Sequence, residues 1–168
     1  IAISNPVDII AHYIYKLSGL PKNQVIGTGT AIDSARLQNM IAQTVNVDPR
    51  SVHAYSMGEH GDSQMVPWST VTIAGKPFYD VIADNKELVG DVDLDELVYR
   101  TTQEGWEIFN RKGTTYYGIA TACVGVIKAI LNDENRIIPV STLLEGEYGE
   151  RDVYAGVPTV LNRSGAYD

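Results

Sequence analysis

The sequence lacks the features that mark several classes of protein. It has a single cysteine, Cys123, so no disulfide can form within the chain, as is typical of proteins from a reducing cytosol. No apolar run approaches the roughly 18 residues needed to span a bilayer, and no basic stretch of the kind found in signal peptides opens the chain. We therefore expect a cytoplasmic protein with no membrane partner.

Positive charge is also scarce. The 13 Lys and Arg residues against 21 Asp and Glu give a formal net charge of −8, which offers no attraction for nucleic acids. HExxH and paired-cysteine patterns are absent, so we expect no metal site. What is present is ordinary: apolar residues make up 44% and charged residues 20%, which predicts a folded globular chain rather than disorder.

Apolar periodicity predicts an alternation of helices and strands. Helices are expected over residues 7–18, 33–46 and 93–131, the last interrupted at 113–118, and Asn5 is expected to cap the first of them. Strands are expected over 25–30, 52–57, 136–144 and 153–161, with a hairpin formed by 69–73 and 77–82. One α/β or α+β unit accommodates this pattern.

His60 is the histidine best placed for proton transfer. It lies in the segment GEHGD at 58–62, after a predicted strand, where glycines on both sides allow an exposed side chain. His12 and His53 fall inside a predicted helix and a predicted strand. A lone loop histidine is more often structural than catalytic, so this pattern leaves both roles open.

Asp33 and Arg36 are three residues apart and share a face of a predicted helix. Spacing alone favours a local ion pair between them. The alternative gives each a separate task, in which the aspartate holds a histidine ring nitrogen and the arginine binds a carboxylate through two parallel hydrogen bonds.

Four segments together resemble the lactate/malate dehydrogenase family. They are ISNPVD at 3–8, GTGTAIDSAR at 27–36, GEHGD at 58–62 and KGTTYYG at 112–118. Each is modest alone, but their order and spacing match the family across almost the whole chain. The resemblance implies an α/β (α+β) C-terminal substrate domain, residues 1–168, in which a mixed or antiparallel sheet packs against long helices.

The resemblance also implies NAD-dependent interconversion of a small 2-oxo acid and the corresponding 2-hydroxy acid. His60 would exchange a proton with the substrate oxygen, Asp33 would hydrogen-bond His60, and Arg36 would bind the substrate carboxylate. Asn5 and Thr115 would line the substrate pocket. Contacts with NAD would come from Ile3, Ser4, Asn5 and Thr28.

The residues at two positions within the motifs bear on the choice of substrate. Glu59 and Thr115 favour the lactate side of the family, which implies pyruvate and L-lactate, with malate as the alternative. Residues 62–71 also resemble L-2-hydroxyisocaproate dehydrogenases, so bulkier acids stay open. Family members form homodimers or homotetramers, which makes a second copy the expected partner.

The cofactor-binding half of the family, with its GxGxxG turn, has no counterpart in these residues. The chain also begins without methionine, inside a predicted strand. We therefore expect residues 1–4 to be the last strand of that half, and the chain to be a fragment that is inactive by itself.

Position 38 departs from a pattern found in many bacterial members of the family. These bind fructose 1,6-bisphosphate through a histidine at the position of His53 and an arginine where this chain has Gln38. Because a bisphosphate requires positive charge, we predict weak or absent activation by this effector. Assays of the complete gene product with and without it test the prediction, and a strong dependence would contradict it.

Overall fold

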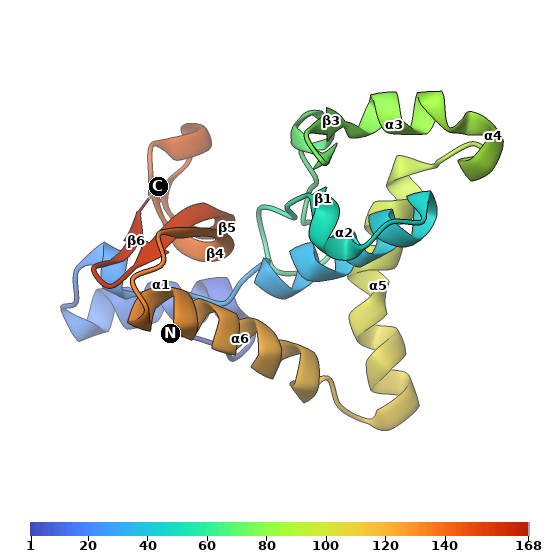
Figure 1. Ribbon diagram of the computed structural model, residues 1–168. Helices are drawn as coiled ribbons and strands as arrows, with labels where there is room; N and C mark the ends of the chain where they lie inside the picture. The colour runs from blue at the N-terminus through green and yellow to red at the C-terminus, as the bar shows by residue number, and fades with distance from the viewer. Residues whose placement is uncertain (168) are drawn as a thin grey trace.

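The computed structural model describes residues 1–167, and Figure 1 shows its arrangement. Among those residues, no helix combines the length and the apolar character that a membrane crossing requires. The helices are α1 Val7–Ser18, α2 Ala31–Val45, α3 Phe78–Asp84, α4 Lys86–Val89, α5 Leu94–Lys112 and α6 Tyr116–Leu131. The strands are β1 Val52–His53, β2 Thr72–Ile73, β3 Lys76–Pro77, β4 Arg136–Glu145, β5 Arg151–Asn162 and β6 Gly165–Tyr167.

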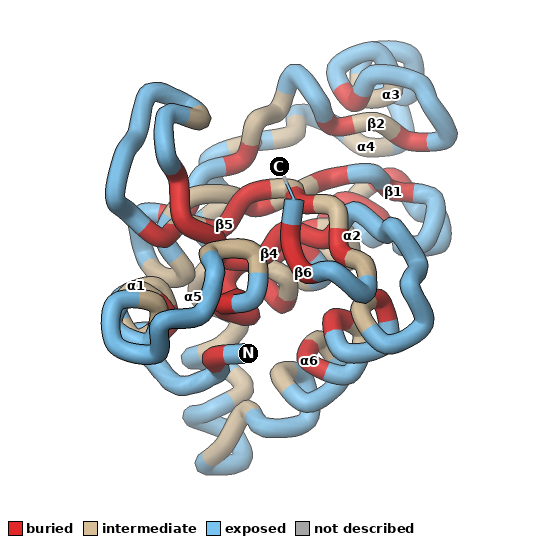
Figure 2. The backbone as a smooth tube through the Cα atoms, turned by 90° about the vertical axis from the view of Figure 1, so that its left-hand side faces the viewer, coloured by how far each residue is buried: buried red, intermediate tan, exposed pale blue. Residues whose placement is uncertain are grey.

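The larger sheet has the antiparallel order β4-β5-β6, and it is covered on both faces. Successive residues of a strand point to opposite faces, so Val140 and Leu143 of β4 belong to different faces. Val140 packs in a cluster with Val126 of α6, whereas Leu143 packs with Ala11 of α1. Seven consecutive residues of β4 are accordingly buried. Figure 2 draws this part of the sheet in the colour of buried residues.

A second core lies beside this sheet and surrounds the middle of α2. Leu37 and Ile41 of α2 are fully buried there with Val71, Phe78 and Leu97. The small antiparallel sheet β1-β2-β3 and α5 complete this part, and Figure 1 shows α2 starting near the larger sheet and running alongside β1. The first turns of α2 are thereby placed next to β4 and β5, where the candidate site forms.

The structure confirms the α/β fold class, the antiparallel sheet and the long helices. It also confirms helices close to the predicted positions in the first half, and the break between α5 and α6 is shorter than expected, at 113–115. The strands predicted at 136–144 and 153–161 are β4 and β5. Strand β6 was not predicted.

Some local predictions were wrong. Residues 78–82 form helix α3 rather than a strand, because Phe78, Val81 and Ile82 reach one core at helical spacing and Pro77 precedes the first turn. The segment predicted as a strand at 52–57 is regular only at Val52–His53, and 25–30 contributes only isolated bridges at position 27. Asn5 does not cap α1, because Pro6 is the residue that immediately precedes the helix and it makes no side-chain cap.

Candidate active site

His60 lies in a loop that is closed at its base by backbone hydrogen bonds. Met57 and Met65 exchange two bonds of 2.8 and 2.9 Å, and Gly58 exchanges two with Gly156 of β5 at 2.8 and 2.7 Å. Gly58 has a φ of 88°, a backbone conformation that residues with a side chain rarely adopt, so a glycine suits this position. We call residues 57–65 the His60 loop. Its base is fixed to the larger sheet.

The ring of His60 is held by Asp33 from the first turn of α2. The Nδ1 atom of His60 lies 2.6 Å from Oδ2 of Asp33, and the Asp33 side chain is only 3% exposed. An ionised carboxylate accepts hydrogen bonds and donates none, so Nδ1 carries the hydrogen. The other ring nitrogen, Nε2, is left for exchange with a substrate.

The environment of His60 favours its protonated form. The hydrogen bond that His60 donates to Asp33 raises the pKa of His60 above its ordinary value of 6.5, and this outweighs the opposing effect of burial. The charges of Asp33 and Asp8 raise this pKa further, while the charge of Arg36 lowers it. A histidine in this setting can hold a proton near neutral pH and release it to an acceptor.

Arg36 lies one turn further along α2 and contacts the same carboxylate. Its Nη1 is 3.2 Å from Oδ1 of Asp33, and its side chain is 14% exposed. The guanidinium lies against Gly105 of α5, where an added Cβ would approach its two terminal nitrogens to 3.3 Å. Asp33 can therefore form the local ion pair with Arg36 and also hold the ring of His60, because each of its two oxygens contacts a different partner.

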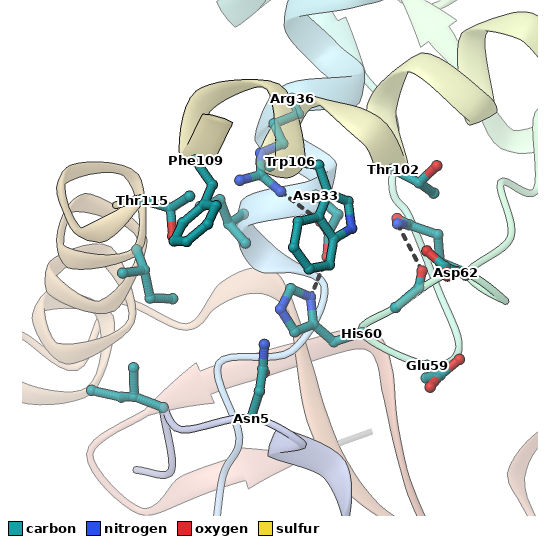
Figure 3. Close-up of a pocket in the computed structure, with 16 residues that line it drawn as sticks. Asn5, Asp33, Arg36, Glu59, His60, Asp62, Thr102, Trp106, Phe109 and Thr115 are labelled. Carbon is teal, nitrogen blue, oxygen red and sulfur yellow. Dashed lines mark hydrogen bonds and ion pairs between the residues drawn. The ribbon is translucent and has the colours of Figure 1, made fainter. Parts of the chain in front are cut away.

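These side chains line one cavity of about 730 Å³. Figure 3 shows Asn5, Arg36, His60 and Thr115 around it, and Ile3 and Asp33 also contribute. Helix α5 forms a further wall through Thr102, Gly105, Trp106 and Phe109, which sequence reasoning missed. Their positions at i, i+3, i+4 and i+7 place them on one helix face, which is the only signal of a shared role that the sequence offers for them.

Other predicted residues lie outside this cavity. Ser4 is exposed and does not line it, and Thr28 is 2% exposed with its backbone N–H donated to Ala2. His53 is exposed on β1 and borders a second cavity together with Gln38, whose amide donates to the Ala54 carbonyl at 3.0 Å. Within residues 1–167, no group of three or more acidic, histidine or cysteine side chains is placed to hold a metal ion.

Comparison with known proteins identifies the family of the chain. Residues 30–168 match the model of the lactate/malate dehydrogenase α/β C-terminal domain. The chain is 55% identical to L-lactate dehydrogenase 3 of Bacillus thuringiensis subsp. konkukian, over 96% of its length and 51% of that protein. It is 51% identical to L-lactate dehydrogenase 1 of Bifidobacterium longum, over 99% of its length and 52% of that protein.

A solved structure is similar as well. The minor L-lactate dehydrogenase from Enterococcus mundtii, in its ligands-bound form, aligns with a TM-score of 0.93 at 43% identity. The alignment covers 99% of this chain and 52% of that one. The chain therefore belongs to the lactate/malate dehydrogenase family and spans about half the length of the relatives that it matches.

Proposed function

We propose that this chain supplies the proton-transfer and substrate-binding groups of an NAD-dependent dehydrogenase that interconverts pyruvate and L-lactate. The observation that carries the proposal is the hydrogen-bonded series Arg36–Asp33–His60 along the wall of one cavity. The relatives named as L-lactate dehydrogenases support this choice of substrate, as do Glu59 and Thr115.

Each residue of the series has a task in this proposal. Arg36 binds the substrate carboxylate with its planar fork, which fixes the orientation of the 2-oxo group. His60 donates the proton on Nε2 to the 2-oxo oxygen during reduction and takes it back during oxidation. Asp33 keeps the ring in one tautomer and stabilises its positive charge. Thr115 and Asn5 border the space that the substrate occupies.

The edge of the cavity beside Asn5 fits a nicotinamide. Ile3 offers a half-exposed apolar side chain for a flat ring, and Asn5 offers an amide for its polar substituent. We propose that these two residues, with Ser4 and Thr28 nearby in the fold, hold NAD, which supplies or accepts the hydride when bound. We place the remaining cofactor contacts in the part of the relatives that this chain does not span, so these residues alone are expected to be inactive.

The working protein is proposed to be a cytoplasmic homodimer or homotetramer. Exposed apolar side chains on α6, among them Val124, Ile127 and Leu131, support an additional protein contact along this helix. The oligomeric state of the complete gene product, measured by light scattering, tests this part of the proposal.

Oxidation of NADH by the complete gene product with different 2-oxo acids tests the function. We expect pyruvate to be preferred over oxaloacetate and 2-oxoisocaproate. A preference of about 100-fold for oxaloacetate, about 2.7 kcal/mol of transition-state discrimination, would replace lactate by malate. Absence of turnover with all three acids would reject the dehydrogenase and leave a non-catalytic domain.

The raised pKa of His60 predicts opposite pH profiles for the two directions. Reduction needs the protonated ring, so its kcat/KM is expected to stay level through pH 6.5. Above the raised pKa of His60, kcat/KM is expected to fall about tenfold per pH unit. Oxidation needs the neutral ring and is expected to rise with pH up to the same point. The stabilising interaction of the charged ring with Asp33 is complete below 6.5 and is lost as the pH passes the folded pKa. Initial rates measured in both directions over a pH series test this, and parallel profiles would contradict it.

A further inference from the structure

The main chain of His60 is held by a second carboxylate, that of Asp8. Asp8 lies in the first turn of α1, 52 residues from His60 in the sequence, and its Oδ2 accepts the backbone N–H of His60 at 3.0 Å. The tasks proposed above for His60, Asp33 and Arg36 do not use this carboxylate. Its contact with the one residue assigned to proton transfer needs an explanation.

The position of Asp8 is itself fixed by the larger sheet. Its Oδ1 accepts a hydrogen bond from the hydroxyl of Ser141, which lies in β4 and is completely buried. The backbone of Ser141 exchanges two hydrogen bonds of 2.9 Å with Gly27. The carboxylate therefore joins α1, β4 and the His60 loop. Because the buried Ser141 holds Oδ1 in place, Oδ2 faces the backbone N–H of His60.

We propose that Asp8 is a positioning residue for the proton transfer assigned to His60, fixing its main chain while Asp33 fixes its ring. The proposal rests on the proposed function. A ring held at Nδ1 alone still moves with its loop, and a displacement of about 1 Å at a reacting atom can cost roughly a hundredfold in rate. Two helices thus hold the two ends of one residue.

The negative charge of Asp8 gives this contact a signature that a merely structural tie would lack. The charged groups around the ring are Asp33 and Arg36 from α2, Asp8 from α1, and Glu59 and Asp62 from the His60 loop. Helices α5 and α6 contribute uncharged residues to the same cavity: Thr102, Gly105, Trp106, Phe109 and Ile119. The negative charge of Asp8 favours the protonated ring, whereas the positive charge of Arg36 disfavours it. Removing the Asp8 charge should therefore lower the pKa of His60.

Two substitutions in the complete gene product separate the hydrogen bond from the charge. Asp8→Asn keeps an oxygen that accepts from His60 but removes the charge. We expect a kcat for pyruvate reduction near wild type at low pH, with the fall of kcat/KM displaced to lower pH because the pKa of His60 is lower. Asp8→Ala also removes the acceptor. We expect kcat to fall roughly tenfold to a hundredfold at every pH, with a smaller change in KM because Arg36 is untouched.

Asp152→Asn is the matched control. Asp152 also holds α1, through Lys16 at 2.7 Å and His12 at 3.2 Å, but within residues 1–167 its side chain has no hydrogen bond or ion pair to the His60 loop. This variant is expected to keep the wild-type pH profile. A profile displaced as far as that of Asp8→Asn would overturn the specific role of Asp8.

A titration of the His60 ring by NMR, in the ¹³C-labelled gene product, needs no turnover. It decides the question if Asp8→Ala fails to fold, and a His60 pKa unchanged in Asp8→Asn would contradict the role of the charge. Wild-type kcat and pH profile in both Asp8 variants would overturn the positioning role while leaving the dehydrogenase standing. A wild-type protein without turnover would instead reject the proposed function, and the NMR comparison would still test Asp8.

Discussion

Replacing His60 by glutamine in the complete gene product is expected to lower kcat for pyruvate reduction by roughly 10²–10⁴-fold. Glutamine has a similar reach and can hydrogen-bond both Asp33 and a substrate oxygen. It has no proton that it can give up near neutral pH, so the 2-oxo oxygen would have to take its proton from water. KM for pyruvate should change much less, because Arg36 remains to bind the carboxylate.

His12→Gln provides the comparison for this variant. His12 lies in α1, hydrogen-bonded to Asp152 at 3.2 Å, and does not line the cavity. The same chemical change there should leave both kinetic constants near wild type. Near-normal turnover in His60→Gln would remove the acid/base role, and a pH profile that kept its shape in this variant would do the same.

The residues of the candidate site could be predicted from the sequence only in part. The spacing of Asp33 and Arg36 places them on one helix face, but it does not show what else approaches that face. His60 is 27 residues away from Asp33, and it arrives because the His60 loop is tied to β5 through Gly58 and Gly156. Contacts of this kind depend on tertiary structure, so the pairing of His60 with Asp33 could be expected only from the resemblance to the family.

The residues of α5 that border the cavity, by contrast, lie outside the family motifs. Trp106 and Phe109 carry no acid/base chemistry and lie in no short motif, so the sequence does not single them out. Only the packing of α5 against α2 shows that they border the same cavity as His60. The predicted extents of the short strands were wrong for a related reason. Strands β1, β2 and β3 are two residues each and are defined by their partners more than by their own composition.

Replacing Arg36 by lysine should raise KM for pyruvate by roughly a hundredfold. Lysine keeps the positive charge but loses the planar fork that grips a carboxylate through two parallel bonds. The structure gives this fork a defined place, since one terminal nitrogen contacts Asp33 at 3.2 Å and Gly105 leaves room beside both. An ammonium group on a flexible stem cannot hold the substrate and Asp33 in the same way. A twofold change or less would show that charge alone is sufficient.

Arg36→Gln together with a substrate that lacks the carboxylate gives a sharper test. Wild type should strongly prefer pyruvate over its neutral amide, and this preference should nearly vanish in Arg36→Gln. A coupling of about 2–4 kcal/mol between the guanidinium and the carboxylate is expected from such a cycle. Arg111→Gln on the exposed side of α5, where Arg111 is 3.8 Å from Glu107, should keep the wild-type preference. If the preference survives in Arg36→Gln, the substrate carboxylate is bound elsewhere, and Arg36 is only the partner of Asp33 in an ion pair within α2.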